Sequence, residues 1–253
     1  MTLTYIASGI VVGCLLGITG VGGGALMTPL LIMAFKIPAA IAVGTDLLFS
    51  GITKALGVAL HHKKNGNVNW HIAFRLSIGS LPAAGLSLVF LNMYAHTGHD
   101  LTSIIKPAIG VALLLTTFAL LNKKRNLSPN TSKLSPTRRS QLTVLLGAVV
   151  GVFVTISSVG AGALGTAVII VLYPALSALE IVGTGLAFSI PLAFVAGCGH
   201  LGLGNVSGEL LASLLIGSLP GIWLGSIIGS KIPDAVLRPA LATVLFIIAI
   251  RCF

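Results

Sequence analysis

Long apolar runs separated by short polar stretches fill this chain of 253 residues. The pattern predicts ten helical segments, five in each half, and most are near or within the length that crosses a bilayer. The expected segments are 3–18, 25–35, 39–60, 71–94, 102–121, 142–155, 163–173, 179–200, 207–230 and 235–250. We therefore expect an all-α polytopic membrane protein.

The second half of the chain repeats motifs of the first at an offset of 138 or 139 residues. Several matches in one order and at one offset indicate a duplicated unit. The matched stretches are VGGGALMT (21–28) with VGAGALGT (159–166), GTDLLFS (44–50) with GTGLAFS (183–189), and IGSLP at 78–82 and 216–220. We expect a first transmembrane repeat over 1–121, a basic linker over 122–140 and a second repeat over 141–253.

Each repeat would hold about four helices and one glycine-rich broken or re-entrant helix of about eleven residues, which is too short to span alone. If the short segment completes one broken span, the chain crosses eight times and the repeats are parallel. If it turns back beside the segment before it, the repeats are inverted. Charge favours inversion, because that arrangement puts Lys231 and Arg238 on the same side as the linker.

Composition agrees with a membrane protein and changes the interpretation of the charge. Only 8% of the residues are charged, against about a quarter in a soluble domain. A net charge of +10 would suggest nucleic-acid binding in a soluble protein, but six of the fifteen basic residues lie in the 122–140 linker. Basic clusters in short loops mark the cytoplasmic side. We expect no nucleic-acid partner, a location in the cell inner (plasma) membrane, and a cytoplasmic linker.

Glycine, serine and threonine interrupt both repeats just before the short segments. Unwound backbone at membrane depth survives only where protein buries it or water reaches it. The helix that follows points its N–H groups and its positive dipole end into the break, which favours an anion, and paired breaks are typical of a transporter site. The candidate substrate-binding residues are Thr19, Gly20, Gly22, Gly23, Gly24, Thr28, Ser157, Ser158, Gly160, Gly162 and Thr166.

The alternative role for small residues in membranes is close helix packing. We expect that role for the glycines at helical spacing outside the breaks. These are Gly13, Gly17, Gly79, Gly85, Gly217, Gly221, Gly225 and Gly229.

Three charged residues inside predicted helices are candidates for coupling or for charge compensation, because burial of charge in a membrane is costly and usually functional. Asp46 and Lys54 share a face of one helix about 12 Å apart along its axis, so they are not a direct pair. Asp46 could carry a coupling proton or simply hydrogen-bond the glycine break. Lys54 and Arg75 could supply positive charge for an anion or reach toward the basic side.

No motif for a nucleotide, a metal or catalysis stands out. GVGGG lacks the setting of a phosphate-binding loop. His61, His62 and His71 have no carboxylate or cysteine partner at a ligand spacing, and His62 and His200 are interpreted as interfacial residues at helix ends. We expect no cofactor, no metal and no enzyme activity.

GITGVGGGALMTPLL and IPAAIAVGTDLL, with VGAGALGTAVII and EIVGTGLAFS in the second half, resemble the TauE/SafE sulfite exporter family over essentially the whole chain. The resemblance implies an inner-membrane permease for sulfite, sulfonates or related sulfur-containing anions. The second repeat has Gly185 where Asp46 would be, and Ser157-Ser158 where Thr19-Gly20 would be. The two breaks therefore need not contribute equally.

Together these features predict a secondary transporter, with export as its direction, whose two halves rock about the paired breaks. The expected partners are a small anionic substrate, the lipid bilayer and a proton as coupling ion, and a homodimer is left open. The rival interpretations are an anion channel, a membrane-embedded enzyme and a non-transporting scaffold.

Overall fold

The computed structural model describes residues 2–19, 24–61, 68–98, 100–122, 135–229 and 234–252. The described residues form ten α-helices and no strand. The helices are α1 (Thr2–Thr19), α2 (Gly24–Met33), α3 (Ala39–His61), α4 (Trp70–His96), α5 (Thr102–Asn122), α6 (Pro136–Ser157), α7 (Ala161–Leu172), α8 (Ala178–Gly202), α9 (Gly208–Gly229) and α10 (Asp234–Ile250). Apart from α6, they begin and end within a few residues of the predicted segments.

Helix α6 begins six residues before its predicted segment, inside the stretch expected to be linker. The N–H of Arg138 donates to the hydroxyl of Ser135, 3.4 Å away, and Pro136 occupies the first helical position. Serine at the N-cap followed by proline is a favoured helix start, because proline has no N–H that would need a partner there. Residues 136–140 are therefore the first turn of a helix.

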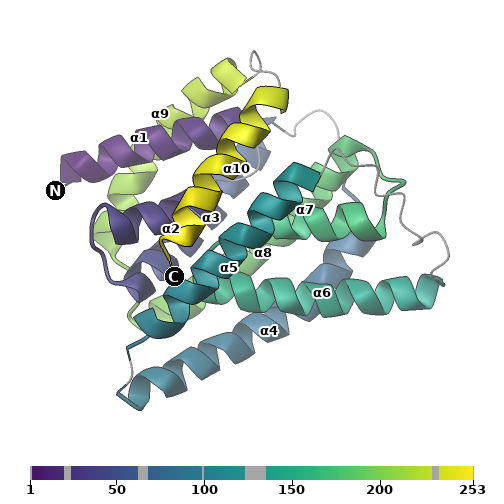
Figure 1. The fold of residues 1–253 in the computed structure, drawn as a ribbon, viewed down its shortest axis with the longest axis horizontal. Helices are drawn as coiled ribbons and strands as arrows, with labels where there is room; N and C mark the ends of the chain where they lie inside the picture. Colours follow the sequence, from purple (N-terminus) through teal and green to yellow (C-terminus); the bar gives the residue numbers. More distant parts are fainter. Residues whose placement is uncertain are drawn as a thin grey trace.

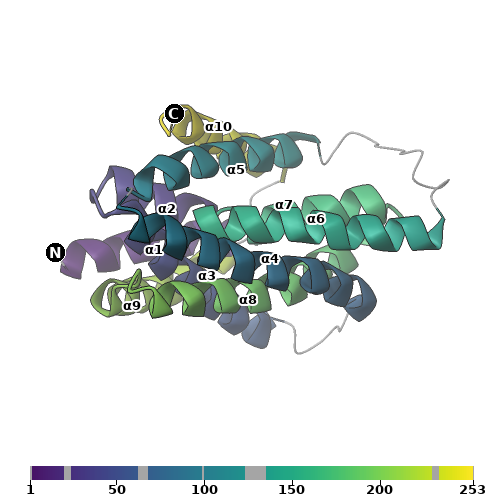
Figure 2. The same cartoon turned by 90° about the horizontal axis from the view of Figure 1, so that it is seen from below.

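The helices pair across the two halves of the chain. α1 packs along α9, α4 along α6, α3 along α8 and α5 along α10. Figure 1 shows α1 beside α9 at one side of the molecule and α4 beside α6 at the other. In Figure 2, α5 and α10 form a layer at one edge. The two halves thus interleave, and neither forms a separate body.

Glycines bring the backbones of α1 and α9, and those of α4 and α6, into direct contact. A Cβ atom at Gly9 would lie 2.6 Å from the carbonyl oxygen of Leu214, and one at Gly147 would lie 2.5 Å from that of Leu76. The predicted packing role is confirmed for Gly13, Gly79, Gly217, Gly221 and Gly225, which all face backbone of the partner helix. It is wrong for Gly85, where a Cβ would meet nothing within 4 Å.

Single contacts also give the direction of a central pair. Gly44 of α3 packs against Asn205 just past α8, and Gly51 packs against Phe194 further back in α8. A later residue of α3 thus contacts an earlier residue of the α8 segment, so α3 and α8 run in opposite directions.

Each short helix runs back beside the helix that precedes it. The Tyr173 hydroxyl, just after α7, lies 2.8 Å from the hydroxyl of Thr143, early in α6. Tyr5, early in α1, packs edge-to-face on Phe35 just after α2, with ring centroids 5.1 Å apart. Both short helices therefore end near the level where the preceding helix begins.

Five of the described helices are long and apolar enough to cross a membrane by length and composition: α3, α4, α6, α8 and α9. Large apolar side chains face outward, among them Trp70, Leu86 and Phe118. In water such an exterior would be an aggregation surface, whereas lipid tails solvate it. The chain is a multi-pass membrane protein.

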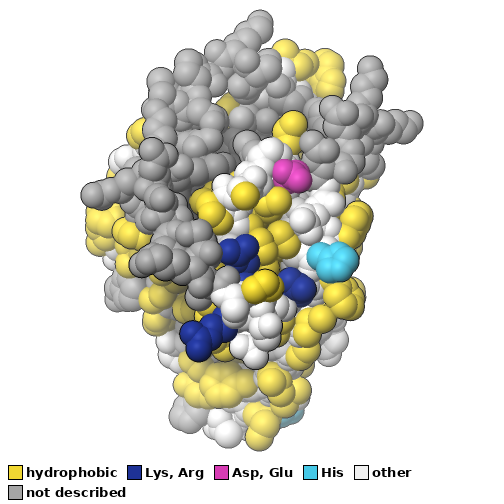
Figure 3. All heavy atoms as spheres, turned by 90° about the vertical axis from the view of Figure 1, so that its right-hand side faces the viewer, with side chains coloured by type: hydrophobic (Ala, Val, Ile, Leu, Met, Phe, Trp, Pro, Cys, Tyr) yellow, Lys and Arg dark blue, Asp and Glu magenta, His cyan; other side chains and the backbone are white. Residues whose placement is uncertain are grey.

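Basic side chains gather at the end of the bundle where α6 begins, which we call the basic end. Figure 3 looks onto the end where α6 begins, and Lys and Arg side chains gather near the middle of that face. Arg75, Arg138 and Arg139 lie in the first two turns of α4 and α6. The opposite end is the one where α4 ends and α5 begins.

Candidate functional site

Asp46, in the middle of α3, is fully buried, and its carboxyl group connects the two halves of the chain. Its Oδ2 atom accepts a hydrogen bond from the hydroxyl of Thr28 in α2, at 2.5 Å. The same atom accepts a second one from the hydroxyl of Ser158, where α6 ends, at 2.9 Å. Three predicted site residues thus meet in one buried cluster.

The other carboxyl oxygen of Asp46 differs from the first. Oδ1 is buried and has no hydrogen-bond partner among the described residues. A buried polar atom without a partner costs free energy, so such an atom calls for an explanation. The cluster thus offers one hydrogen-bonding position that these side chains leave unused.

The second-half break joins α6 to α7 through two residues with left-handed backbone. Ser158 has φ 59° and Gly160 has φ 94°. Glycine adopts that conformation without a Cβ penalty, whereas serine does so rarely. Strained positions of this kind cluster at functional sites. The geometry also turns the Ser158 side chain toward Asp46.

Helix α7 begins at the break with its first turn uncapped by a side chain. Gly160 is the N-cap residue and makes no side-chain hydrogen bond, and the first N–H bonded within the helix is that of Leu164, to the Gly160 carbonyl. The N–H groups before it, from Ala161 to Ala163, point into the break together with the positive end of the helix dipole. A negatively charged group is stabilised at such a position.

His200 is part of the same region, and the prediction that it is interfacial is wrong. Its side chain is fully buried, and its Nε2 atom lies 2.9 Å from the carbonyl oxygen of Thr155. That carbonyl belongs to the last turn of α6, which has no later helical N–H to pair with. His200 therefore satisfies the backbone at the break. His200 follows His62 by 138 residues, the offset of the repeated motifs, but that spacing by itself does not indicate a buried hydrogen bond.

Two buried threonines of the repeated GT motifs tie each half to the other, and sequence reasoning missed them. Thr45 accepts the N–H of Ser207, at 3.1 Å, and Thr184 accepts the N–H of Asn69, at 2.9 Å. Ser207 directly precedes α9, and Asn69 directly precedes α4. Each threonine therefore anchors the start of a helix from the opposite half.

Within the described part of the chain, the remaining predicted substrate-binding residues make no hydrogen bond to Asp46, and those with hydroxyl groups bond to backbone of their own segment. Ser157 is buried, and its hydroxyl donates back to Phe153 and accepts from the N–H of Val159. The Thr166 hydroxyl donates to the carbonyls of Gly162 and Ala163 within α7. Gly24 begins α2. Gly20, Gly22 and Gly23 lie outside the described residues, as does the side chain of Thr19.

Of the two predicted cationic candidates, only Lys54 lies on the same helix as Asp46. Lys54 is buried on α3, two turns beyond Asp46, with 8% of its surface exposed. Arg75 is half-buried near the start of α4, at the basic end of the bundle. Lys54 therefore interacts with Asp46 electrostatically across two helical turns, without a direct contact. Arg75 lies nearer the basic end of the bundle and is not part of the Asp46 cluster.

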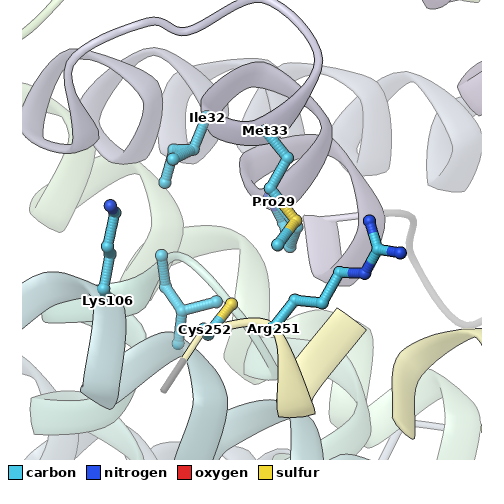
Figure 4. A pocket seen from close by; sticks show the side chains of 7 residues that line it. Pro29, Ile32, Met33, Lys106, Arg251 and Cys252 are labelled. Atoms are coloured by element: carbon cyan, nitrogen blue, oxygen red, sulfur yellow. The ribbon is translucent and has the colours of Figure 1, made fainter. Parts of the chain in front are cut away.

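A separate cavity of about 130 Å³ lies at the end opposite the basic one. Figure 4 shows Lys106 and Arg251 on its two sides, with Cys252 between them. The other lining residues are Pro29, Ile32, Met33 and Ile109. The described residues hold no group of three or more His, Cys, Asp or Glu that could bind a metal ion.

The sequence pattern of the family described as "Sulfite exporter TauE/SafE" matches residues 5–252. The chain is 36% identical over 255 residues to "Probable membrane transporter protein YjnA" of Bacillus subtilis (strain 168), covering 99% of both chains. It is 29% identical over 232 residues to "Probable membrane transporter protein YdhB" of the same organism, covering 90% of this chain and 91% of that one. No solved structure matches. The chain is thus a membrane transporter that belongs to the sulfite exporter TauE/SafE family.

Proposed function

We propose that this transporter carries a small sulfur-containing anion, such as sulfite or a sulfonate, by alternating access. The observation that carries the proposal is the buried Asp46–Ser158 contact beside the uncapped start of α7. The family's description supports the substrate class and names export as the direction.

The anion binds at the break, where α7 presents N–H groups that have no helical acceptor. The hydroxyls of Thr28 and Ser158 lie at the same point and can turn from Asp46 toward a bound oxyanion. The motif repeat leads us to expect that the first-half break, with Thr19, Gly20 and Gly22–Gly24, also contributes to anion binding. The cluster is buried, so the anion reaches it only after a movement that opens one side.

The two repeats, 1–121 and 141–253, are inverted relative to each other. The opposite directions of α3 and α8, which are equivalent helices, support this arrangement. The matching contacts of Gly9 with Leu214 and of Gly147 with Leu76 exchange under one offset of 138 residues, which supports a two-fold relation between the repeats. The basic end then faces the cytoplasm together with the 122–140 linker, and the membrane is the inner (plasma) membrane.

The moving bodies are helix pairs rather than the sequence halves. Backbone-to-backbone packing through glycine makes α1–α9 one rigid unit and α4–α6 another. Each unit takes one helix from each repeat. We therefore expect alternating access to come from rocking of these two units about α3 and α8, which replaces the idea that the halves rock against each other.

Flux of sulfite, sulfate and methanesulfonate into proteoliposomes tests the proposal. We expect saturable flux that is accelerated by anion on the opposite side. Gly160→Ala should abolish it, because the added Cβ meets Leu164 at the break and α7 loses its start geometry. Gly204→Ala is the matched control, because Gly204 also has positive φ (74°) but lies in a turn with nothing within 4 Å. Unsaturable flux without trans-acceleration would indicate a channel instead.

A further inference from the structure

Four of the acidic residues of this chain lie at helix starts, and the fifth lies within a helix. The sequence has five. Asp100 accepts the N–H of Thr102, at 2.8 Å, at the start of α5, and Glu180 forms a capping box with Ser177 at the start of α8. Glu209 lies in the first turn of α9 and Asp234 is the first residue of α10. Carboxylates are stabilised at helix N-termini, so only Asp46, in mid-helix, lacks that explanation.

The hydrogen bonds around Asp46 distinguish its two oxygens. Oδ2 receives two hydroxyl donors, whereas Oδ1 has no partner among the described residues. When the carboxyl is protonated, an Oδ1–H group becomes a donor that needs an acceptor. The start of α7, where an anion would be held, follows two residues after Ser158 in the chain, and Ser158 contacts the same carboxyl group. An oxygen of that anion is the acceptor that would complete the cluster.

Few charges act on Asp46 from the helices around it. The described parts of α2 and α7 carry none. Lys54 lies two turns away on α3, and His200 approaches α3 beside Gly44. The other charges of the helices packed on α3 sit at helix starts: Arg138 and Arg139 of α6, Glu180 of α8, Glu209 of α9 and Lys106 of α5. Lys54 is two turns away and compensates an ionised Asp46 only in part, so the carboxylate would repel a bound anion and weaken binding by roughly a hundredfold at a few ångströms.

We propose that the anion binds only together with one proton on Asp46, which donates its Oδ1–H to an oxygen of the anion. This inference rests on the proposed function and adds the coupling ion, its carrier and its stoichiometry. The equivalent position of the other repeat is Gly185, against which Thr166 packs. One carboxyl group therefore serves both repeats, and the ratio is one proton to one anion.

The coupling has a direct consequence for energetics. A monovalent anion carried with one proton moves no net charge, so the membrane potential does not drive the cycle and the pH gradient does. Protons and anions travel in the same direction. The chain then exports the anion only while the outward anion gradient exceeds the inward proton gradient.

The test compares exchange with coupled flux in proteoliposomes, with methanesulfonate as the probe because its charge does not change across the neutral range. Wild type should show an apparent affinity that falls as the pH rises, by up to about tenfold per pH unit once Asp46 is ionised. It should also accumulate methanesulfonate inside vesicles that are alkaline within. In detergent, addition of the anion should draw about one proton per anion from a weakly buffered solution.

Asp46→Asn keeps the shape and supplies an amide donor that does not titrate. The exchange that this variant retains should show an affinity independent of pH, and both accumulation and proton uptake should be lost. Asp100→Asn is the matched control: it makes the same change at an exposed helix cap, where hydrogen bonding from Thr102 holds the pKa of the carboxyl below its usual range. It should behave as wild type.

The outcomes separate the two claims. Accumulation by Asp46→Asn, or a pH-independent affinity in the wild type, would overturn the coupling while leaving transport in place. If Asp46→Asn exchanges nothing, Asp46→Glu decides, because a retained carboxyl should retain pH-dependent exchange, and pH-independent exchange there would refute the idea. Absence of any exchange by the wild type would overturn the proposed function, and the coupling with it.

Discussion

Ser158 donates a hydrogen bond to Asp46 across 112 residues of chain, and the two side chains are almost completely buried. One belongs to a helix of the first half and the other ends a helix of the second. Ser158 holds its hydroxyl there through a left-handed backbone conformation that is costly for serine. This hydrogen bond links the two halves at a strained break, so a movement of one half can change the position of the other.

Replacing Ser158 by alanine should weaken anion binding while leaving the fold intact. The variant removes one of two donors to Asp46, and loss of a hydrogen bond to a buried polar partner costs about 1–3 kcal/mol, or about five- to 150-fold in apparent affinity. Concentration dependence of methanesulfonate exchange measures it. Ser77→Ala, which removes a hydroxyl bonded within α4, is the control and should be unaffected. Equal losses in both variants would mean that the effect is general.

Replacing a packing glycine by alanine should destabilise the protein strongly. Cβ atoms at Gly79 and Gly217 would meet the carbonyl oxygens of Val144 and Ile6, so the helices must separate. Overpacking of this kind costs about 1–3 kcal/mol. Thermal unfolding in detergent measures the change. Gly85→Ala is the control on the same helix as Gly79, and it should be neutral or stabilising by up to about 1 kcal/mol through helix propensity.

Thr45→Val and Thr184→Val should each lower stability by a similar amount. Each change removes the hydroxyl that accepts a backbone N–H at the start of a helix from the other half. We expect about 1 kcal/mol for each, and additive effects in the double variant because the sites share no partner. Unfolding temperatures of the singles and the double provide the measurement. A large effect of only one threonine would contradict the equivalent roles assigned to them.

Neutralising Lys106 and Arg251 together should reduce the rate of anion entry from the cavity side. Two exposed cations raise the local concentration of anions, and this steering is screened at high ionic strength. We expect a rate several-fold lower than wild type at low salt and no difference at high salt, measured as initial uptake with the protein oriented in vesicles. Arg138→Gln, at the opposite end, should leave entry from this side unchanged. A deficit that persists at high salt would point to direct binding instead.

The sequence by itself determined the class of the protein and the segments of the fold. Helices α1–α10 follow from apolar runs and from glycine and proline boundaries, which are local signals. The motif repeat located Thr28, Asp46 and Ser158 as candidates, since charge and glycine clusters at membrane depth are expensive and therefore informative. The start of α6 at Pro136 was local as well, but the basic composition of the linker hid the cap.

Only the tertiary structure decided which candidates meet. Asp46 and Ser158 are joined because α3 of one half packs where α6 of the other ends, and no local pattern encodes that distance. His200 looked interfacial in the sequence, yet its imidazole is buried on the last turn of α6, because an unpaired carbonyl there needs a donor. The sequence motifs place Gly185 at the position equivalent to Asp46, but only the fold shows that the one carboxyl group, on Asp46, contacts Ser158 at the break of the second half.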